Sequence, residues 1–233
     1  MQVCLFLDGG SGGEPPLDLH ALKRTASEID GLCQFVAHEP IADPGGPHGA
    51  PDPATPSCML QWYFDDLSAL EIALEPEGAV HRALRGAALA KLDTHGFSQQ
   101  VMAVRKLAPP QAKAISDHAE RCTYMVAYEG PAEDFGAWLA HYLTHHPPLM
   151  LQLPALRELE IYTRMDSRSG LPFAHANAMQ RNKVVFDDAD SLARALASPV
   201  RDAMRRDFHA LPPYGGATPH YPMRSIYGKF AGP

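Results

Sequence analysis

The tripeptide Phe64-Asp65-Asp66 recurs as Phe186-Asp187-Asp188, 122 residues further along the chain. In each copy an apolar stretch ends at the phenylalanine, and a helical pattern begins after the aspartates. Upstream, Gly31-Leu32 and Ala155-Leu156 stand at nearly the same spacing, and each pair begins a stretch typical of a strand. Self-similarity with a period near half the chain indicates two copies of one small unit rather than one irregular domain.

Each half follows the order β-α-β-β-α-β, which is the ferredoxin-like arrangement. The expected fold class is therefore α+β, with two tandem ferredoxin-like units whose antiparallel sheets pack to form an intramolecular α/β barrel. The predicted divisions are a degenerate first unit over residues 1–107, a linker over 108–120 and a second unit over 121–233. Two long loops, 40–56 and 165–177, join the second and third strands of each unit and are expected outside the sheet core.

Composition favours a globular protein with a small-molecule partner. The 233 residues are 45% hydrophobic and 20% charged, and the formal net charge is −7. An acidic chain without a basic patch argues against a nucleic-acid partner. The cysteines lack a C-x-x-C pair and lie in apolar stretches, which favours reduced core thiols. With neither a signal peptide nor an apolar stretch of membrane-spanning length, a cytoplasmic protein is expected.

The most informative helical segment for function runs from Glu133 to Leu153. At about 100° per residue, Phe135, Leu139, Tyr142 and His146 share one face, so His146 is expected to point toward the sheet. Pro147 and Pro148 follow it directly, so the helix is predicted to kink or end at His146. Two interpretations stay open: a core histidine satisfied by a backbone group, or an imidazole that lines a pocket and exchanges protons.

Metal and cofactor motifs are weak in this sequence. His141 and His145 have the i, i+4 spacing of metal ligands, but the glutamate of an H-E-x-x-H motif is missing and His175 is only a loop candidate for a third ligand. Neither a P-loop nor a G-x-G-x-x-G fingerprint occurs. We therefore expect no metal and no cofactor. Arg201, Arg205 and Arg206 cluster, and their spacing predicts the exposed face of a helix.

The second unit resembles the EthD family of dimeric α/β-barrel proteins over roughly residues 121–211. The resemblance rests on short motifs in the family's order: Asp134-Phe135, Tyr142, His146-Pro147-Pro148-Leu149, Leu153 to Arg157, Tyr162, Val185 to Asp188, Leu192, Ser198-Pro199 and Asp207-Phe208. The first unit keeps Phe64-Asp65-Asp66 but has no equivalent of the H-P-P-L motif. The resemblance implies a barrel that is usually formed by dimerisation, so this chain is expected to be a monomeric pseudo-dimer or a homodimer.

The family is associated with the degradation of ethers and aromatic compounds. The resemblance implies a cofactor-independent lyase, cyclase, isomerase or decarboxylase acting in catabolism on a small apolar oxygenated or aromatic compound. His146 is the expected general acid/base. The expected substrate-binding residues are Tyr142, Tyr128, Tyr162 and His145. Two alternatives stay open: a non-catalytic binding or accessory protein of a degradation pathway, and a haem-binding barrel protein with His146 as the axial ligand.

Overall fold

The computed structural model describes residues 1–11, 18–41, 55–86, 96–110 and 120–229. The first half contains β1 (Val3–Asp8), α1 (Leu19–Ala26), β2 (Leu32–Pro40), β3 (Met59–Phe64), α2 (Leu67–Ala73), α3 (Ala79–Gly86) and β4 (Ser98–Leu107). The second half contains β5 (Glu120–Tyr128), α5 (Phe135–Met150), β6 (Glu158–Arg164), β7 (Ala174–His175), β8 (Gln180–Phe186), α6 (Ala189–Leu196), α7 (Val200–Ala210) and β9 (His220–Lys229).

The strands close into one antiparallel barrel. Within the first half the spatial order is β2-β3-β1-β4, and within the second it is β9-β5-β8-β6, so both halves have the ferredoxin-like order. The halves are joined edge to edge, because β2 pairs with β9 and β4 pairs with β6. The predicted fold class is confirmed. The boundaries of the units stay a prediction, since residues 111–119 lie outside the described residues.

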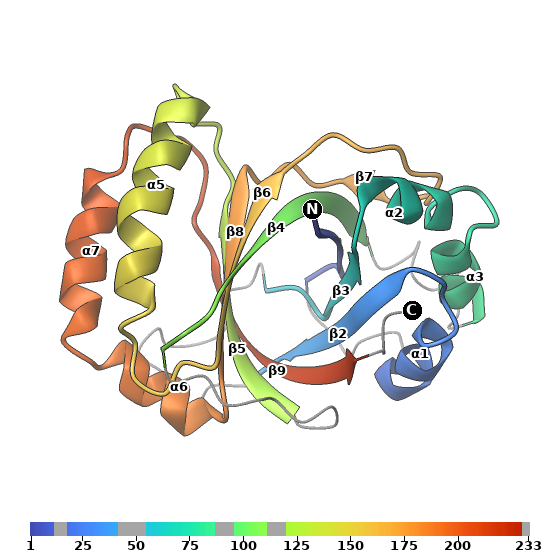
Figure 1. The fold of residues 1–233 in the computed structure, drawn as a ribbon, viewed down its shortest axis with the longest axis horizontal. Helices are drawn as coiled ribbons and strands as arrows, with labels where there is room; N and C mark the ends of the chain where they lie inside the picture. The colour runs from blue at the N-terminus through green and yellow to red at the C-terminus, as the bar shows by residue number, and fades with distance from the viewer. Residues whose placement is uncertain (12–17, 42–54, 87–95, 111–119, 230–233) are drawn as a thin grey trace.

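Helices cover the outside of the barrel in two groups. Figure 1 shows α1, α2 and α3 on one side and α5, α6 and α7 on the other. Each group packs on the outer face of its own half-sheet and forms a separate apolar core. A third apolar cluster, which includes Phe6, Met102 and Val185, fills the barrel interior. The two half-sheets therefore share one interior, while each carries its own helix–sheet layer.

Aspartates start the helices that follow the repeated tripeptide. Asp66 accepts a hydrogen bond from the Ala69 amide (2.8 Å), and Asp188 accepts one from the Ser191 amide (2.7 Å). Each satisfies a backbone donor that the first turn of a helix leaves unpaired. Within the described residues, no helix is both long enough and apolar enough to cross a membrane.

The predicted end of the His146 helix is wrong. Helix α5 does not end at His146 but continues through both prolines to Met150. A stripe of buried side chains along it, which includes Tyr142, His146 and Met150, packs on the sheet, and this tertiary packing outweighs the local preference of a residue before proline.

The loop 165–177 lies outside the core as expected, except at two buried residues. Leu171 and Phe173 are buried in the apolar cluster of the first half, and the loop includes β7, which pairs with β4. Most of the equivalent loop, 42–54, lies outside the described residues.

Candidate active site

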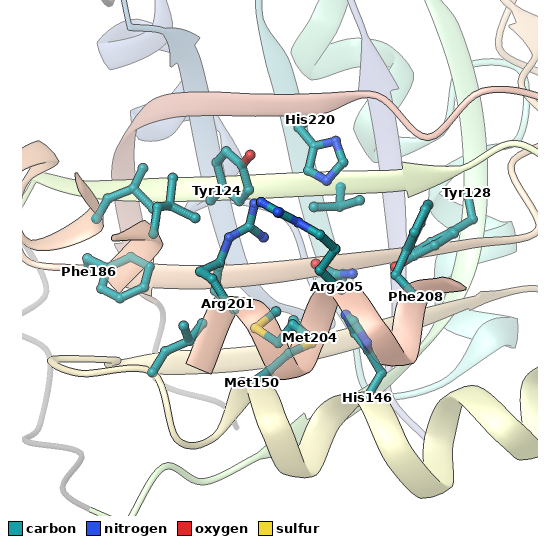
Figure 2. Close-up of a pocket in the computed structure, with 16 residues that line it drawn as sticks. Tyr124, Tyr128, His146, Met150, Phe186, Arg201, Met204, Arg205, Phe208 and His220 are labelled. Carbon is teal, nitrogen blue, oxygen red and sulfur yellow. The ribbon is translucent and has the colours of Figure 1, made fainter. Parts of the chain in front are cut away.

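A cavity of about 170 Å³ lies between the second half-sheet and helices α5, α6 and α7. Its wall is mostly apolar, with a few polar side chains among the aromatic and aliphatic ones (Figure 2). A cavity of roughly 150 Å³ is large enough to hold a benzene molecule. The space therefore suits a single ring or a short branched compound.

The cavity wall is a product of strand alternation. On β8 the side chains of Asn182 and Val184 face the cavity, while those of Lys183 and Val185 lie on the barrel side. Successive side chains on a strand point to opposite faces of the sheet. The second half-sheet thus separates two environments, the cavity under the helices and the interior of the barrel.

His146 lies on the cavity wall and is paired with Asp207. Its Nδ1 atom is 2.7 Å from Asp207 Oδ2, and both side chains are nearly buried, at 7% and 10% exposed. His146 comes from α5 and Asp207 from α7, two helices that pack side by side. Because a carboxylate can only accept, Nδ1–H donates and Nε2 carries the lone pair when the imidazole is neutral.

The surroundings of His146 favour its neutral form. Burial lowers the pKa of His146, and the nearby Arg201 lowers that pKa further, whereas Asp207 opposes both effects; the net pKa is below the ordinary value of 6.5. A neutral imidazole with a fixed tautomer can accept a proton at Nε2, and the resulting imidazolium would be stabilised by Asp207. Figure 2 shows the His146 ring directed toward the cavity.

Two tyrosines and an amide surround the histidine. Tyr128 lines the cavity, and burial holds the pKa of its hydroxyl well above 10, so Tyr128 is a donor at neutral pH. Tyr142 is fully buried behind the wall, with its ring centroid 5.1 Å from that of His146. Asn182 donates from Nδ2 to the Tyr142 hydroxyl (2.9 Å), and its buried Oδ1 has no partner within the described ranges.

Two expected substrate-binding residues lie elsewhere. Tyr162 is inside the barrel, hydrogen-bonded to the hydroxyl of Tyr63 (2.7 Å), because it alternates with the outward Ile161 on β6. His145 is exposed on α5, with its ring 4.6 Å from that of His141. The structure therefore brings together His146, Tyr128 and, one layer behind, Tyr142, but separates them from Tyr162 and His145.

Asp207 and Asn182 are the site residues that sequence reasoning missed. Asp207 is 61 positions from His146, so local spacing cannot join the two. The available signal was the period of α7, where Met204 and Phe208 face the cavity and Asp207 is one turn from the first of them. For Asn182 the signal was its alternation with Lys183 and Val185 on a buried strand.

Metal and haem fit this cavity poorly. Across the described residues there is no cluster of three or more histidine, cysteine, aspartate or glutamate side chains that could hold a metal ion. His141 Nε2 lies 3.4 Å from Asp207 Oδ1, so this pair shares its carboxylate with His146. A cavity of about 170 Å³ is also too small for the four-pyrrole macrocycle of haem, so haem does not fit this site.

Comparisons with solved structures support the fold. An anthrone oxidase-like protein superposes with a TM-score of 0.63 at 14% identity, over 97% of this chain and 91% of that one. A putative monooxygenase from Fusobacterium nucleatum gives a TM-score of 0.60 at 10% identity, over 99% and 95% of the two chains. At such identities the likeness shows the fold alone. The chain has the fold of the dimeric α/β-barrel proteins, with the whole barrel built from one polypeptide.

An ethyl tert-butyl ether d (EthD) family protein from Bacillus halodurans is also similar, at 23% identity over 42% of this chain and 98% of that one. Its TM-score of 0.34 is too low to support an argument. No protein-family model matches the sequence, and no curated protein matches it.

Proposed function

We propose that this protein is a cofactor-independent enzyme that moves a proton on a small, largely apolar, oxygenated or aromatic compound. The observation that carries the proposal is the contact of His146 with Asp207 on the wall of a ring-sized cavity. His146 Nε2 would take the proton, and Asp207 would hold the ring in the required tautomer and stabilise the imidazolium. This arrangement is a positioned general base, a group that typically contributes a factor of about 10²–10⁴ to a rate.

The groups around His146 support a reaction through an enol or enolate. Proton abstraction next to a carbonyl places negative charge on the carbonyl oxygen, and hydrogen-bond donors stabilise that charge. Tyr128 keeps its proton at neutral pH and lines the same cavity. The amide of Asn182 offers a further polar contact. Aldol-type cyclisation and isomerisation begin with such a proton abstraction, whereas decarboxylation reaches the same enolate by loss of CO₂ and then takes up a proton, which a protonated His146 could donate. EthD-like motifs around His146 agree with this range of reactions.

The alternative of a non-catalytic binding protein is less well supported. A binding protein needs the cavity but has no need for a buried carboxylate on the far nitrogen of His146, because that contact orients a base rather than a ligand.

The barrel closes within one chain, so its described strands leave no free edge at which a second copy would complete the barrel. We propose that one chain is sufficient for activity.

Hydrogen–deuterium exchange tests the proposal for any substrate that passes through an enol, whatever its product. A panel of small phenolic, β-dicarbonyl and aryl-ketone compounds is incubated with the protein in D₂O, and deuterium uptake and compound loss are followed by mass spectrometry. The wild type should accelerate exchange or loss for at least one compound, and His146→Gln should lose about 10²–10⁴-fold of that rate. His145→Gln is the matched control, since His145 is exposed on the same helix. Equal rates for wild type and His146→Gln would refute the proposal.

A further inference from the structure

Two arginines of α7 line the cavity, and of the three residues that the sequence predicts on an exposed helix face only Arg201 is half-buried. Arg201 and Arg205 stand one helical turn apart and both belong to the cavity wall, together with Tyr124 and His220. Figure 2 shows both side chains reaching across the cavity toward Tyr124. Arg206, the third member of the cluster, is exposed and lies outside the wall.

The positive charge of Arg201 is directed into the site. Its charge affects residues on two different walls. On α5 it adds to the effect of burial in lowering the pKa of His146. On β5 burial raises the pKa of Tyr124 to about 12, and Arg201 opposes that rise. Arg201 is half-buried, and Arg205 is exposed at the cavity's edge. A guanidinium that faces both an imidazole and a phenol across one cavity is in position to contact a ligand bound there.

Within the described residues, neither arginine has a carboxylate partner. The other partly buried arginines of the chain are paired: Arg181 with Asp8, Arg121 and Arg157 with Asp187. Asp207, which contacts the cavity residue His146, is already engaged by that histidine at 2.7 Å. Two like charges one turn apart on a helix repel each other, and an anion between them would relieve that repulsion.

We propose that the cavity recognises an anionic compound, with a ring-sized apolar body against Val126, Val184 and Met204 and a carboxylate held by Arg201 and Arg205. This inference rests on the proposed function, since it assigns a substrate class to the same cavity. Guanidinium groups match carboxylates in geometry and charge. The volume of about 170 Å³ leaves room for one ring, so the substrate class is a small aromatic or cyclic carboxylic acid.

The geometry divides the work between the two ends of the substrate. The carboxylate would fix one end at α7, and the rest of the molecule would extend toward His146 and Asn182, whose buried Oδ1 has no partner within the described residues. A hydroxyl on the ring would satisfy that buried acceptor, whose desolvation is otherwise uncompensated. Holding a substrate at two points places the reacting atom near the base, which is the usual source of rate from orientation.

Isothermal titration with matched probes tests the charge requirement. Benzoate, salicylate and phenylacetate are each compared with the corresponding neutral amide at neutral pH. At least one carboxylate should bind about 10- to 100-fold more tightly than its amide, as expected for charge-assisted hydrogen bonds. Arg201→Gln and Arg205→Gln should each remove most of this preference, while Arg206→Gln should keep it. The comparison of each carboxylate with its amide uses the wild-type protein alone, so it remains decisive even if a variant fails to fold.

The outcome separates this inference from the proposed function. The preference should persist in His146→Gln, which lacks the proposed base. If no carboxylate binds more tightly than its amide, or if Arg206→Gln weakens binding as much as Arg201→Gln, the inference is overturned, while deuterium exchange that depends on His146 would still support the enzyme. A clear carboxylate preference without any exchange would instead reject only the proposed function.

Discussion

Lys183 Nζ lies 3.0 Å from Glu160 Oε2 inside the barrel, where both side chains are almost completely buried. Burial alone would raise the pKa of Glu160, but Lys183, Lys106 and the hydroxyls of Tyr162 and Tyr63 together outweigh it and hold that pKa well below its ordinary value. The same pair keeps the pKa of Lys183 high. Lys183, on β8 of the second half, also donates to the hydroxyl of Tyr63 (2.9 Å), on β3 of the first half. The ion pair is therefore hydrogen-bonded across the barrel to the other half.

Breaking this ion pair should be costly. Lys183→Met leaves a buried carboxylate without its main partner and should lower the free energy of unfolding by about 3–5 kcal/mol. The double variant Glu160→Gln/Lys183→Met buries no charge and should be more stable than Lys183→Met alone. Urea unfolding of the two singles and the double gives the coupling energy. Lys106→Met, which removes a half-exposed lysine 3.7 Å from Glu160, should cost at most about 1 kcal/mol. Strictly additive losses would show that the pair is not coupled.

The stability of the barrel should fall in mild acid because of His38. Both ring nitrogens of His38 are hydrogen-bonded inside the barrel, to Ser225 and Gln61 at 2.8 Å each. Burial, reinforced by Lys183, lowers its pKa from 6.5 to about 3. Below pH 6.5 the unfolded chain therefore binds a proton that the folded chain does not, so stability that is complete above pH 6.5 is lost as the pH falls.

The measurement is urea unfolding of three proteins at pH 7.5 and 5.0. The wild type should lose stability between these conditions, and His38→Gln should lose up to about 2 kcal/mol less, since each pH unit below the unfolded pKa is worth about 1.4 kcal/mol. His20→Gln is the control, because His20 is exposed. Glu160 adds its own acid lability only below its unfolded pKa of about 4.5, outside this window. A wild-type pH slope in His38→Gln would contradict the assignment.

The sequence predicts the barrel well and the site only in part. Repetition of Phe64-Asp65-Asp66 at Phe186-Asp187-Asp188 indicates two equal halves, and the helical period places His146 toward the sheet, because both patterns can be seen in the sequence without knowing how the chain packs. The partner of His146 is not local: Asp207 reaches it only once α7 packs on α5. The prediction for Tyr162 is wrong about the face of its strand, since Tyr162 alternates with Ile161 and joins the polar network in the barrel.

Charged residues are the hardest to place from sequence. Lys183 lies in a strand that is buried throughout, and nothing nearby in the sequence indicates that Glu160 is the acid that pairs with it. Arg201 and Arg205 fit a solvated helix face by spacing alone, and only the packing of α7 over the sheet turns them toward the cavity. Long-range pairing of charges depends on the register of strands and helices, which helical or strand period does not specify.

The pKa of His146 should respond in opposite directions to its two charged neighbours. Asp207 raises this pKa and Arg201 lowers it, on a background lowered by burial. Asp207→Asn should therefore shift the titration midpoint of His146 further down, and Arg201→Gln should shift it up. The Cε1–H signal of His146, assigned by its loss in His146→Gln, can be followed by NMR against pH. A wild-type midpoint above 6.5, or shifts of the reverse sign, would disprove the described balance of burial and charge.

Neighbouring valines on β8 give the sharpest test of the cavity. Val184 lines the cavity and Val185, the next residue, packs inside the barrel with no exposed surface. The same substitution should therefore have opposite consequences at the two positions.

Val184→Phe places its ring in the space of about 170 Å³, so it should leave the free energy of unfolding within about 1 kcal/mol of wild type and abolish benzoate binding. Val185→Phe overpacks a filled core and should cost about 1–3 kcal/mol with benzoate binding retained in the folded protein. Urea unfolding and calorimetric titration of both variants decide the matter. Equal destabilisation by the two would mean that the cavity is closed in solution, and benzoate binding that survives Val184→Phe would place the ligand elsewhere.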